Sequence, residues 1–266
     1  NFSVTLTAVA DMPVPKIVAA TGGAGGLEDT PIPLAISANI VDNDGSQVLS
    51  FIIADVPAGA SFVNAGGTPI GTLVSPGVYS FTAAEVASLR IIPPLNSSDD
   101  FTLQVTVRST EVAPGNPGNG DFREVTVPLP VQVKGVADLP NLSVSTVTVA
   151  EDTPIPLGST IVSALTDTDG SEVLFYVISG LPAGVVPSAG TYIGGEWQIA
   201  AADIATVTIP AVANFSGNYT TTFAPNLKVR AVSQEADGDQ VSREANLNIV
   251  VTPVMDAFPG WSPNIL

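Results

Sequence analysis

The sequence contains no cysteine and no histidine. Without cysteine the chain can form neither disulfides nor thiolate metal sites, and it has no cysteine nucleophile. Without histidine it lacks the commonest general base, the usual ligand of zinc, copper and iron, and every triad built on that residue. We therefore expect a protein that is not an enzyme. The absence of cysteine also suits a secreted bacterial protein that folds without oxidation.

Basic residues are scarce, with 8 Lys and Arg against 25 Asp and Glu and a formal net charge of -17. Such a surface repels phosphate backbones, which excludes nucleic acid as a partner. The hydrophobic fraction of 45% is too high for a disordered acidic tail. No stretch approaches the 18 or more apolar residues of a membrane span, so we expect no membrane insertion. No basic segment followed by an apolar core opens the sequence, so no secretion signal is visible there.

What the sequence does contain is an internal repeat. The string EDTPIPL occurs at Glu28–Leu34 and again at Glu151–Leu157, while VADMP at Val9–Pro13 returns as VADLP at Val136–Pro140. DNDGSQ at 42–47 likewise returns as DTDGSE at 167–172. The pattern predicts a tandem of two modules, with the spacing drifting only where loops differ in length. We expect the last strand of a preceding module at 1–10, module 1 at 11–137, module 2 at 138–255, and a next junction or tail at 256–266.

The alternation of apolar and polar residues predicts β-strands. Clear examples are 101–109, 125–133, 226–233 and 246–251. A Thr-x-x-Glu capping box at 82–89, matched by 200–207, predicts a single helical turn in each module. The glycine-rich segment 22–29 is expected to be a flexible loop rather than part of a stacked β-roll. Short strands with Gly and Pro between them predict an all-β chain of two immunoglobulin-like β-sandwiches joined end to end.

The acidic residues recur at fixed places in the repeat. Asp42 and Asp44, like Asp167 and Asp169, put two carboxylates on one side of a tight turn that ends in glycine. One interpretation is a solvated turn, because Asp and Gly are common turn residues. The other is a calcium site, favoured by further repeated acidic residues in the VAD, EDTPIPL and STE/SQE strings. An EF-hand is excluded, because the twelfth position is isoleucine instead of glutamate.

This arrangement resembles that of cadherin-type domains, in which acidic groups from two modules and their linker bind calcium. The resemblance implies a central set of Glu28, Glu111, Asp138, Asp167 and Asp169. It implies a partial set at the carboxyl end, Glu151, Glu235 and Asp256, which Asp237 and Asp239 could join, and a partial set at the amino end, Asp11, Asp42 and Asp44. The linker departs from cadherins, since it lacks their Asn-rich signature and carries one Asp.

A closer resemblance covers essentially the whole chain. EDTPIPL, DTDGSE and VAD-x-P are similar to motifs in the tandem extender modules of long RTX-type bacterial adhesins. That resemblance implies Ca²⁺ as the cofactor, a monomer whose partners are neighbouring repeats of the same chain, and a place on the bacterial cell surface. It implies a spacer that projects a distal ligand-binding region for adhesion and biofilm formation.

Two other functions compete with the spacer. The loop at 111–121 could recognise a peptide or a glycan, which would make the chain a ligand-binding module of the same kind of adhesin. Hydrolysis by Asp99 and Asp100 is disfavoured, because adjacent carboxylates on a strand point apart. Trp197 and Tyr79 occupy equivalent repeat positions, which favours a core or edge aromatic over a sugar-stacking platform.

Overall fold

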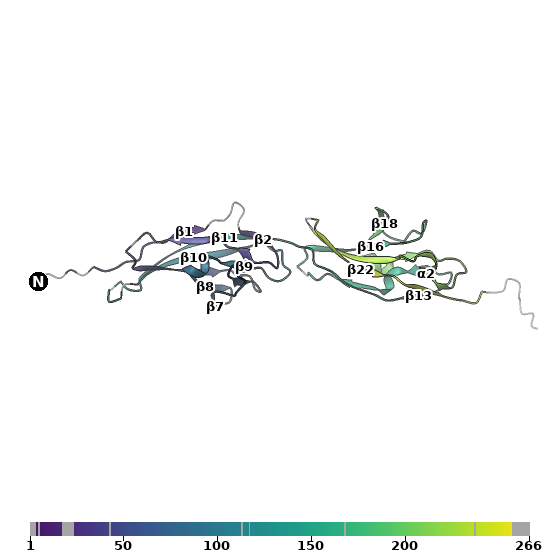
Figure 1. Cartoon of the computed structure of the whole chain (residues 1–266), viewed down its shortest axis with the longest axis horizontal. Helices are drawn as coiled ribbons and strands as arrows, with labels where there is room; N and C mark the ends of the chain where they lie inside the picture. Colours follow the sequence, from purple (N-terminus) through teal and green to yellow (C-terminus); the bar gives the residue numbers. More distant parts are fainter. Residues whose placement is uncertain are drawn as a thin grey trace, which may run out of the picture. The chain divides into compact units, whose positions relative to one another are not determined.

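The structure is a computed structural model that describes residues 4, 6–17, 24–42, 44–112, 114–116, 118–167, 169–236 and 238–256. The chain divides into two compact units, Asn1–Val136 and Ala137–Leu266, called unit 1 and unit 2 below. Strands predominate in both (Figure 1). No helix among the described residues is long and apolar enough to cross a membrane.

The main sheet of unit 1 has six strands. In spatial order they are β2 (Ala24–Leu27), β11 (Phe122–Lys134), β10 (Phe101–Glu111), β5 (Gln47–Ala54), β8 (Val78–Thr82) and β7 (Thr72–Ser75). A second layer contains the three-stranded sheet β3 (Ile32–Pro33), β9 (Arg90–Ile92) and β6 (Ser61–Val63), together with the pair β1 (Val14–Ile17) and β4 (Ile36–Asn39). Side chains from both layers join one core cluster, so unit 1 is a β-sandwich.

The core of unit 1 follows from the two-residue period of its strands. Along β10, Leu103, Val105 and Val107 are fully buried, while the residues between them are partly exposed. Ile32 and Ile91 face this row from the second layer and are buried as well.

Unit 2 repeats the design with small changes. Its main sheet is β17 (Thr191–Ile193), β18 (Glu196–Ala200), β16 (Glu172–Ser179), β21 (Lys228–Glu235) and β22 (Gln240–Asn246). The second layer contains β13 (Val147–Ala150), β23 (Ile249–Thr252) and β20 (Gly217–Asn218), and the pairs β12 (Asn141–Val144) with β15 (Ile161–Ala164) and β14 (Ile155–Pro156) with β19 (Thr208–Ile209). Ile178, Val229, Leu247 and Ile249 form the centre of its core.

The helical pieces are single turns. The predicted turn at 82–89 is confirmed as α1 (Ala83–Val86), where Thr82 and Glu85 form both hydrogen bonds of the capping box. Its counterpart is the 3-10 turn η2 (Ile204–Thr206). Two further pieces, η1 (Leu157–Thr160) and α2 (Tyr219–Phe223), were not predicted.

The all-β sandwich fold predicted from the sequence is confirmed, and the strands predicted at 101–109, 125–133 and 226–233 lie within or largely within β10, β11 and β21. The prediction of one strand over 246–251 is only partly right, because Asn246 ends β22 and β23 begins at Ile249.

Two local predictions are wrong. Within the segment expected to be a flexible loop, Ala24–Leu27 forms β2 and pairs in parallel with Val131–Lys134. Gly26 has a packing reason, because a Cβ there would lie 2.7 Å from Ile32 Cγ1. The described part of 1–10 is not a strand, since its partners are loop groups: Ala8 N–H donates to Asn116 Oδ1. Residues 1–3, 5 and 257–266 lie outside the described part of the chain.

An aromatic cluster closes the core of unit 1 on one side. The Phe62 ring on β6 contacts Tyr79 and Phe81 edge-on, with ring centroids 5.1 and 5.0 Å away. Phe62 is only 3% exposed, so its ring fills space between the two layers.

Removing this ring tests the described packing. Phe62→Ala should lower the free energy of unfolding of unit 1 by about 3–5 kcal/mol, because it removes buried apolar area and leaves a cavity. Leu95→Ala, at a position 80% exposed, is the matched control and should change it by less than about 0.5 kcal/mol. Chemical denaturation of the full chain measures both, and equal effects would contradict the role assigned to Phe62.

Candidate metal-ligating residues

A tight acidic turn precedes β5 in unit 1. Asp42 Oδ1 accepts the N–H of Asp44 at 3.0 Å, and Asp44 Oδ1 accepts the N–H of Ser46 at 2.7 Å. Gly45 has a φ of +82°, which glycine adopts without steric cost. Hydrogen bonds from Ser46 hold the pKa of Asp44 below its usual value, so this carboxylate stays ionised. One oxygen of each carboxylate thus accepts a backbone N–H and shapes the turn.

The strands that follow add two side chains to this turn. Gln47 at the start of β5 lies opposite Glu111 at the end of β10. Glu111 is 1% exposed, and its Oε1 atom is buried without a hydrogen-bond partner among the described residues. Ser109 Oγ lies 2.6 Å from Gln47 Oε1, to which it donates. A buried carboxylate oxygen without a donor is costly, and a cation would remove that cost.

The chain enters unit 1 past the same groups. Ala10 N–H donates to Asp121 Oδ2 at 3.1 Å, and Asp11 N–H donates to Gln47 Oε1 at 3.4 Å. The Ala10 hydrogen bond, with a smaller contribution from Arg123, lowers the pKa of Asp121. Asp11 itself is exposed. We refer to Asp11, Asp42, Asp44, Gln47, Glu111 and Asp121 as the entry cluster of unit 1.

Unit 2 repeats the turn with similar distances. Asp167 Oδ1 accepts the N–H of Asp169 at 2.8 Å, and Asp169 Oδ1 accepts the N–H of Ser171 at 2.7 Å. Gly170 again has a positive φ, of +93°. Ser171 Oγ also donates to Glu235 Oε1 at 3.1 Å, and carboxylate oxygens of Asp167 and Glu235 approach within 4.8 Å.

Two glutamates replace the glutamine–glutamate pair of unit 1. Glu172 on β16 lies opposite Glu235 on β21, and they are 6% and 5% exposed. Oε2 of Glu172 and the hydroxyl of Ser233 are buried without hydrogen-bond partners among the described residues. Burial raises the pKa of Glu235, and the charges of Glu172, Asp167 and Asp169 raise it further. The ionised cluster is therefore strained by desolvation and by like charge.

The entering segment is bound in the same way as in unit 1. Ala137 N–H donates to Asp239 Oδ2 at 3.2 Å, and Asp138 N–H donates to Glu172 Oε1 at 2.5 Å. Asp138, Asp167, Asp169, Glu172, Glu235 and Asp239 form the entry cluster of unit 2. Asp237, which the sequence placed with Asp239 as a possible additional ligand, lies outside the described residues.

The EDTPIPL string has its own structural explanation. Glu28 N–H donates to the Lys134 carbonyl at 3.0 Å, and Glu28 Oε1 accepts the N–H of Val136 at 2.5 Å. Glu151 does the same with the carbonyl of Thr252 and the N–H of Val254, at 2.9 and 2.5 Å. Each glutamate thereby holds the segment that follows the last strand of its unit.

The other residues of the EDTPIPL string also have structural roles. Asp29 has a φ of +53° and accepts the N–H of Asn96, as Asp152, with a φ of +60°, accepts that of Asn214. Thr30 Oγ1 donates back to the Leu27 carbonyl. The two apolar letters, Ile32 and Leu34 in unit 1 and Ile155 and Leu157 in unit 2, are buried. The identity of the two strings is thus largely a requirement of the fold.

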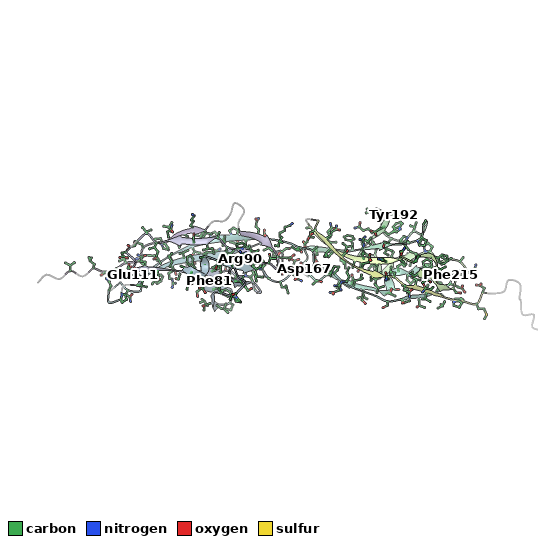
Figure 2. The ribbon with its side chains drawn as sticks, viewed as in Figure 1. Phe81, Arg90, Glu111, Asp167, Tyr192 and Phe215 are labelled. Atoms are coloured by element: carbon green, nitrogen blue, oxygen red, sulfur yellow. The ribbon has the colours of Figure 1, made fainter. Side chains whose placement is uncertain are left out.

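The expected grouping of Glu111 with Glu28 is wrong. Glu28 directly follows β2, and Leu27 of β2 pairs with Lys134 of β11. That pair lies just beyond Phe101, the first residue of β10, whereas Glu111 is the last residue of β10. At about 3.3 Å per residue the two ends of β10 are roughly 30 Å apart. Figure 2 shows Glu111 at one end of unit 1. It belongs with Asp42 and Asp44, because the N–H of Val112 donates to the carbonyl of Ser46 at the end of their turn.

The expected grouping of Glu235 with Glu151 and Asp256 is wrong for the same reason. Glu235 ends β21 beside Asp167, whereas Glu151 follows β13 and bonds to Thr252. β22 starts near Glu235 and runs to the Lys228 end of β21, and β23 continues from there. Asp256 is exposed and follows Val254 at that far end.

Three residues of the entry clusters were not predicted as site residues, namely Gln47, Glu172 and Asp121, whereas Asp239 was expected as a possible additional ligand. Gln47 and Glu172 are the last letters of DNDGSQ and DTDGSE, so the repeat itself could have indicated them. Asp121 and Asp239 each follow a glycine directly before a strand, and each accepts the N–H of the entering alanine. Different loop lengths hid this equivalence, with ten positions from Glu111 to Asp121 and four from Glu235 to Asp239.

The donor set of both entry clusters fits a hard divalent cation. Every side chain in them offers oxygen, and Glu111 and Glu172 each have a buried oxygen that nothing in the described residues satisfies. Calcium accepts six to eight oxygens in flexible geometry, including carboxylates from separate loops. Zinc and copper prefer nitrogen and sulfur ligands, which these clusters do not supply.

No protein-family model matches the chain, and no curated protein matches it in sequence. The chain is similar to solved cadherin structures. Mouse cadherin-23 EC22-24 is 17% identical, with a TM-score of 0.41 over 91% of this chain and 65% of that one. Protocadherin gamma B2 extracellular cadherin domains 1-5 is 13% identical, with a TM-score of 0.44 over 92% and 40%. Mouse clustered PcdhgC3 EC1-3 is 15% identical, with a TM-score of 0.39 over 91% and 68%.

The raised pKa of Glu235 predicts how stability depends on pH without a metal ion. Because the folded state binds this proton more tightly than the unfolded state, its stabilisation is complete below pH 4.5 and is lost as pH rises through the folded pKa. Glu235→Gln should therefore unfold at a higher temperature than the parent in EDTA at pH 7, with a difference that shrinks toward pH 4.5.

The exposed Asp203→Asn, which removes the same charge elsewhere in unit 2, is the control and should show no such pH trend. Thermal melts monitored by circular dichroism across this pH range supply the comparison. A Glu235→Gln variant that is less stable than the parent in EDTA at pH 7 would contradict the assignment of strain to this carboxylate.

Proposed function

We propose that the chain is a pair of calcium-stiffened extender modules from a large bacterial cell-surface adhesin. It acts outside the cell as a monomer whose partners are neighbouring repeats, and it holds a distal ligand-binding region away from the surface for adhesion and biofilm formation. The observation that carries this proposal is the recurrence of the entry cluster. In both units a buried carboxylate with an unsatisfied oxygen lies beside an Asp-x-Asp turn.

Electrostatics supplies the mechanism. Burial is the largest cause of the raised pKa of Glu235, and the nearby charges of Glu172, Asp167 and Asp169 raise this pKa further. A bound cation would reverse the sign of these interactions and favour the folded arrangement. In unit 2 the ligands would come from Asp138, Asp167, Asp169, Glu172 and Glu235, and in unit 1 from Asp11, Asp42, Asp44 and Glu111. Glu28, Glu151 and Asp256 remain proposed ligands from the carboxyl end of each unit.

A spacer needs a stiff connection between repeats, and the backbone hydrogen bonds suggest how one could arise. Glu28 holds the N–H of Val136, the last residue of unit 1, while Asp239 and Glu172 hold the N–H groups of Ala137 and Asp138. Three successive peptide groups are thus bound by carboxylates. We infer that an ion bound in the entry cluster of unit 2 also restrains the peptide groups of Ala137 and Asp138, whose N–H groups Asp239 and Glu172 accept.

The alternative, ligand binding by the loop at 111–121, is less well supported. Asn116 Oδ1 accepts the N–H of Ala8, and Asn116 Nδ2 donates to the Leu6 carbonyl. A Cβ on Gly118 would lie 1.6 Å from the Ala8 carbonyl oxygen, so the backbones are in close contact. Much of this loop is therefore occupied by the segment that enters unit 1.

Calcium titration of the full chain tests the proposal. Calcium should raise the melting temperature by mass action, with about 2.7 kcal/mol gained at a hundredfold excess over its Kd. Asp169→Asn keeps an oxygen to accept the Ser171 N–H but loses a charge, so it should weaken calcium binding at least tenfold. Asp203→Asn is the charge-matched control and should bind as the parent does. Unchanged melting and unchanged small-angle scattering on chelation with EDTA would refute the spacer proposal.

The difference between the two entry clusters allows a reciprocal test. Unit 1 has Gln47 where unit 2 has Glu172, so Glu172→Gln should lower the overall calcium affinity measured by calorimetry and Gln47→Glu should raise it. Each change alters one charge and almost no volume. If both changes shift the affinity in the same direction, these positions do not act as ligands.

A further inference from the structure

The two units differ beside the tryptophan of unit 2. Ile53 pairs with Tyr79 in unit 1 as Ile178 pairs with Trp197 in unit 2, which makes Tyr79 and Trp197 equivalent. Val63 pairs with Arg90 on β9. At the corresponding place in unit 2, the N–H of Ser188 donates to the carbonyl of Thr208 on β19 at 2.8 Å. Counting back one residue places Pro187 of unit 2 where unit 1 has Phe62.

This replacement removes a core ring from unit 2, where Pro187 is buried and directly follows Val186. Pro187 has no ring that reaches across the core as Phe62 does, and the strand corresponding to β6 is absent from the described residues of unit 2. The chain is also shorter here. Eight positions separate Val63 from Gly71, whose counterparts Ser188 and Gly190 are two positions apart, and the partly buried Ile70 before Gly71 is matched by the smaller Ala189 before Gly190.

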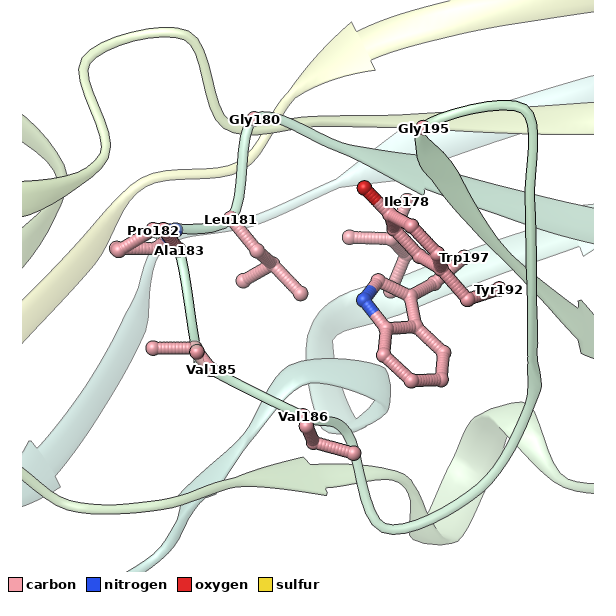
Figure 3. A pocket seen from close by; sticks show the side chains of 11 residues that line it. Ile178, Gly180, Leu181, Pro182, Ala183, Val185, Val186, Tyr192, Gly195 and Trp197 are labelled. Atoms are coloured by element: carbon pink, nitrogen blue, oxygen red, sulfur yellow. The ribbon is translucent and has the colours of Figure 1, made fainter.

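A pocket of about 440 Å³ lies in this part of unit 2. Its apolar walls include Ile178, Leu181, Val185, Tyr192 and Trp197 (Figure 3). The rings of Tyr192 and Trp197 are tilted by 53°, with centroids 5.2 Å apart. Tyr192 is 61% exposed, so its ring borders the opening. The volume lies within the range of small-molecule sites.

The lining defines the chemistry of an occupant. It contains no charged side chain and no Asn or Gln side chain. It therefore offers neither the counter-ion that a charged ligand needs nor the planar polar side chains that usually bind sugar hydroxyls. The net charge of -17 also disfavours an anion. The indole nitrogen of Trp197 lies on the side toward Leu181, where it can donate one hydrogen bond (Figure 3).

We propose that this pocket of unit 2, the Trp197 pocket, binds an uncharged aromatic ring of about phenyl size. The argument is internal to the chain, because Tyr79, the equivalent of Trp197, has the phenyl ring of Phe62 in edge-on contact in unit 1. A ligand ring would make the same contacts with Trp197 and Tyr192, which aromatic pairs favour. The ring can belong to a peptide side chain or to a free small molecule.

The test uses the full chain with Trp261→Phe, which leaves Trp197 as the only tryptophan. N-acetyl-phenylalaninamide and benzyl alcohol are titrated while the indole N–H signal of Trp197 is followed by NMR. Both should produce saturable shifts at millimolar concentrations, the range expected for ligands of this size. N-acetyl-alaninamide should produce none. Tighter binding of the phenylalanine probe than of benzyl alcohol would indicate a peptide source, and the reverse order a small molecule.

A substitution at Pro187, which directly follows Val186 of the pocket lining, is the matched intervention. Pro187→Phe restores the residue type of unit 1 and should weaken binding of both probes at least tenfold. Val162→Phe adds the same ring at a position of unit 2 that is 70% exposed and outside the pocket lining, and it should leave binding unchanged. Because Pro187→Phe could disturb its loop, intermolecular NOEs from the probe ring to Leu181 and Trp197 in the Trp261→Phe chain provide a second measurement.

Several results would overturn the proposal. They are a lack of saturable shifts, NOEs to other residues only, and undiminished binding by a folded Pro187→Phe variant. A response to glucose without a response to the phenyl probes would also overturn it, in favour of a sugar platform. The titrations are made in EDTA and repeated in calcium. Binding in both is expected, so failure of the calcium proposal leaves this test intact.

Discussion

The structure depends on like charges that are held close together by backbone N–H donors. In each unit the entering Ala and Asp residues donate their N–H groups to side-chain oxygens of that unit, and Asp-x-Asp turns use one oxygen of each carboxylate in the same way. These donors stabilise the geometry without neutralising the charge. Glu111 and Glu172 keep buried oxygens that no donor in the described residues reaches. A cation is the natural partner for such atoms, since it can contact several carboxylates at once.

The same logic separates residues that build the fold from those that are available to a ligand. Asp29 and Asp152 are identical in the two repeats, yet each holds an asparagine loop through a hydrogen bond at 2.9 or 2.8 Å. Repetition in a sequence therefore marks any role that both modules share, structural or functional. The entry clusters differ from such residues because burial and unsatisfied oxygens coincide there. That coincidence is a property of packing, and it is seen only in three dimensions.

The sequence was sufficient to predict the repeat, the sandwich class and most of the long strands, because alternation and turn chemistry are local signals. It was not sufficient to assign acidic residues to one end of a module. Glu28 and Glu111 lie at opposite ends of unit 1 because β10 carries the chain from one end to the other, and strand direction is set by pairing. The glycine-rich strand β2 was missed for a related reason. Its Gly26 is required by the neighbouring Ile32 side chain, which no local pattern reveals.

The two modules have diverged in the charge of their entry clusters and in the packing of their cores. Unit 1 replaces one of the paired glutamates with Gln47, whose Oε1 accepts from Ser109, and it fills its core with Phe62. Unit 2 keeps the unsatisfied pair of Glu172 with Ser233 and has the open space beside Trp197. Buried polar atoms without partners among the described residues occur in both units, at Gln47 Nε2 and Glu111 Oε1 in unit 1 and at Glu172 Oε2 and Ser233 Oγ in unit 2. The open space beside Trp197 is the difference that costs unit 2 free energy, since a cavity lacks packing contacts. Because binding to the folded state adds stability by mass action, a ligand in this space would stabilise unit 2, whereas the Phe62 side chain stabilises unit 1 from within.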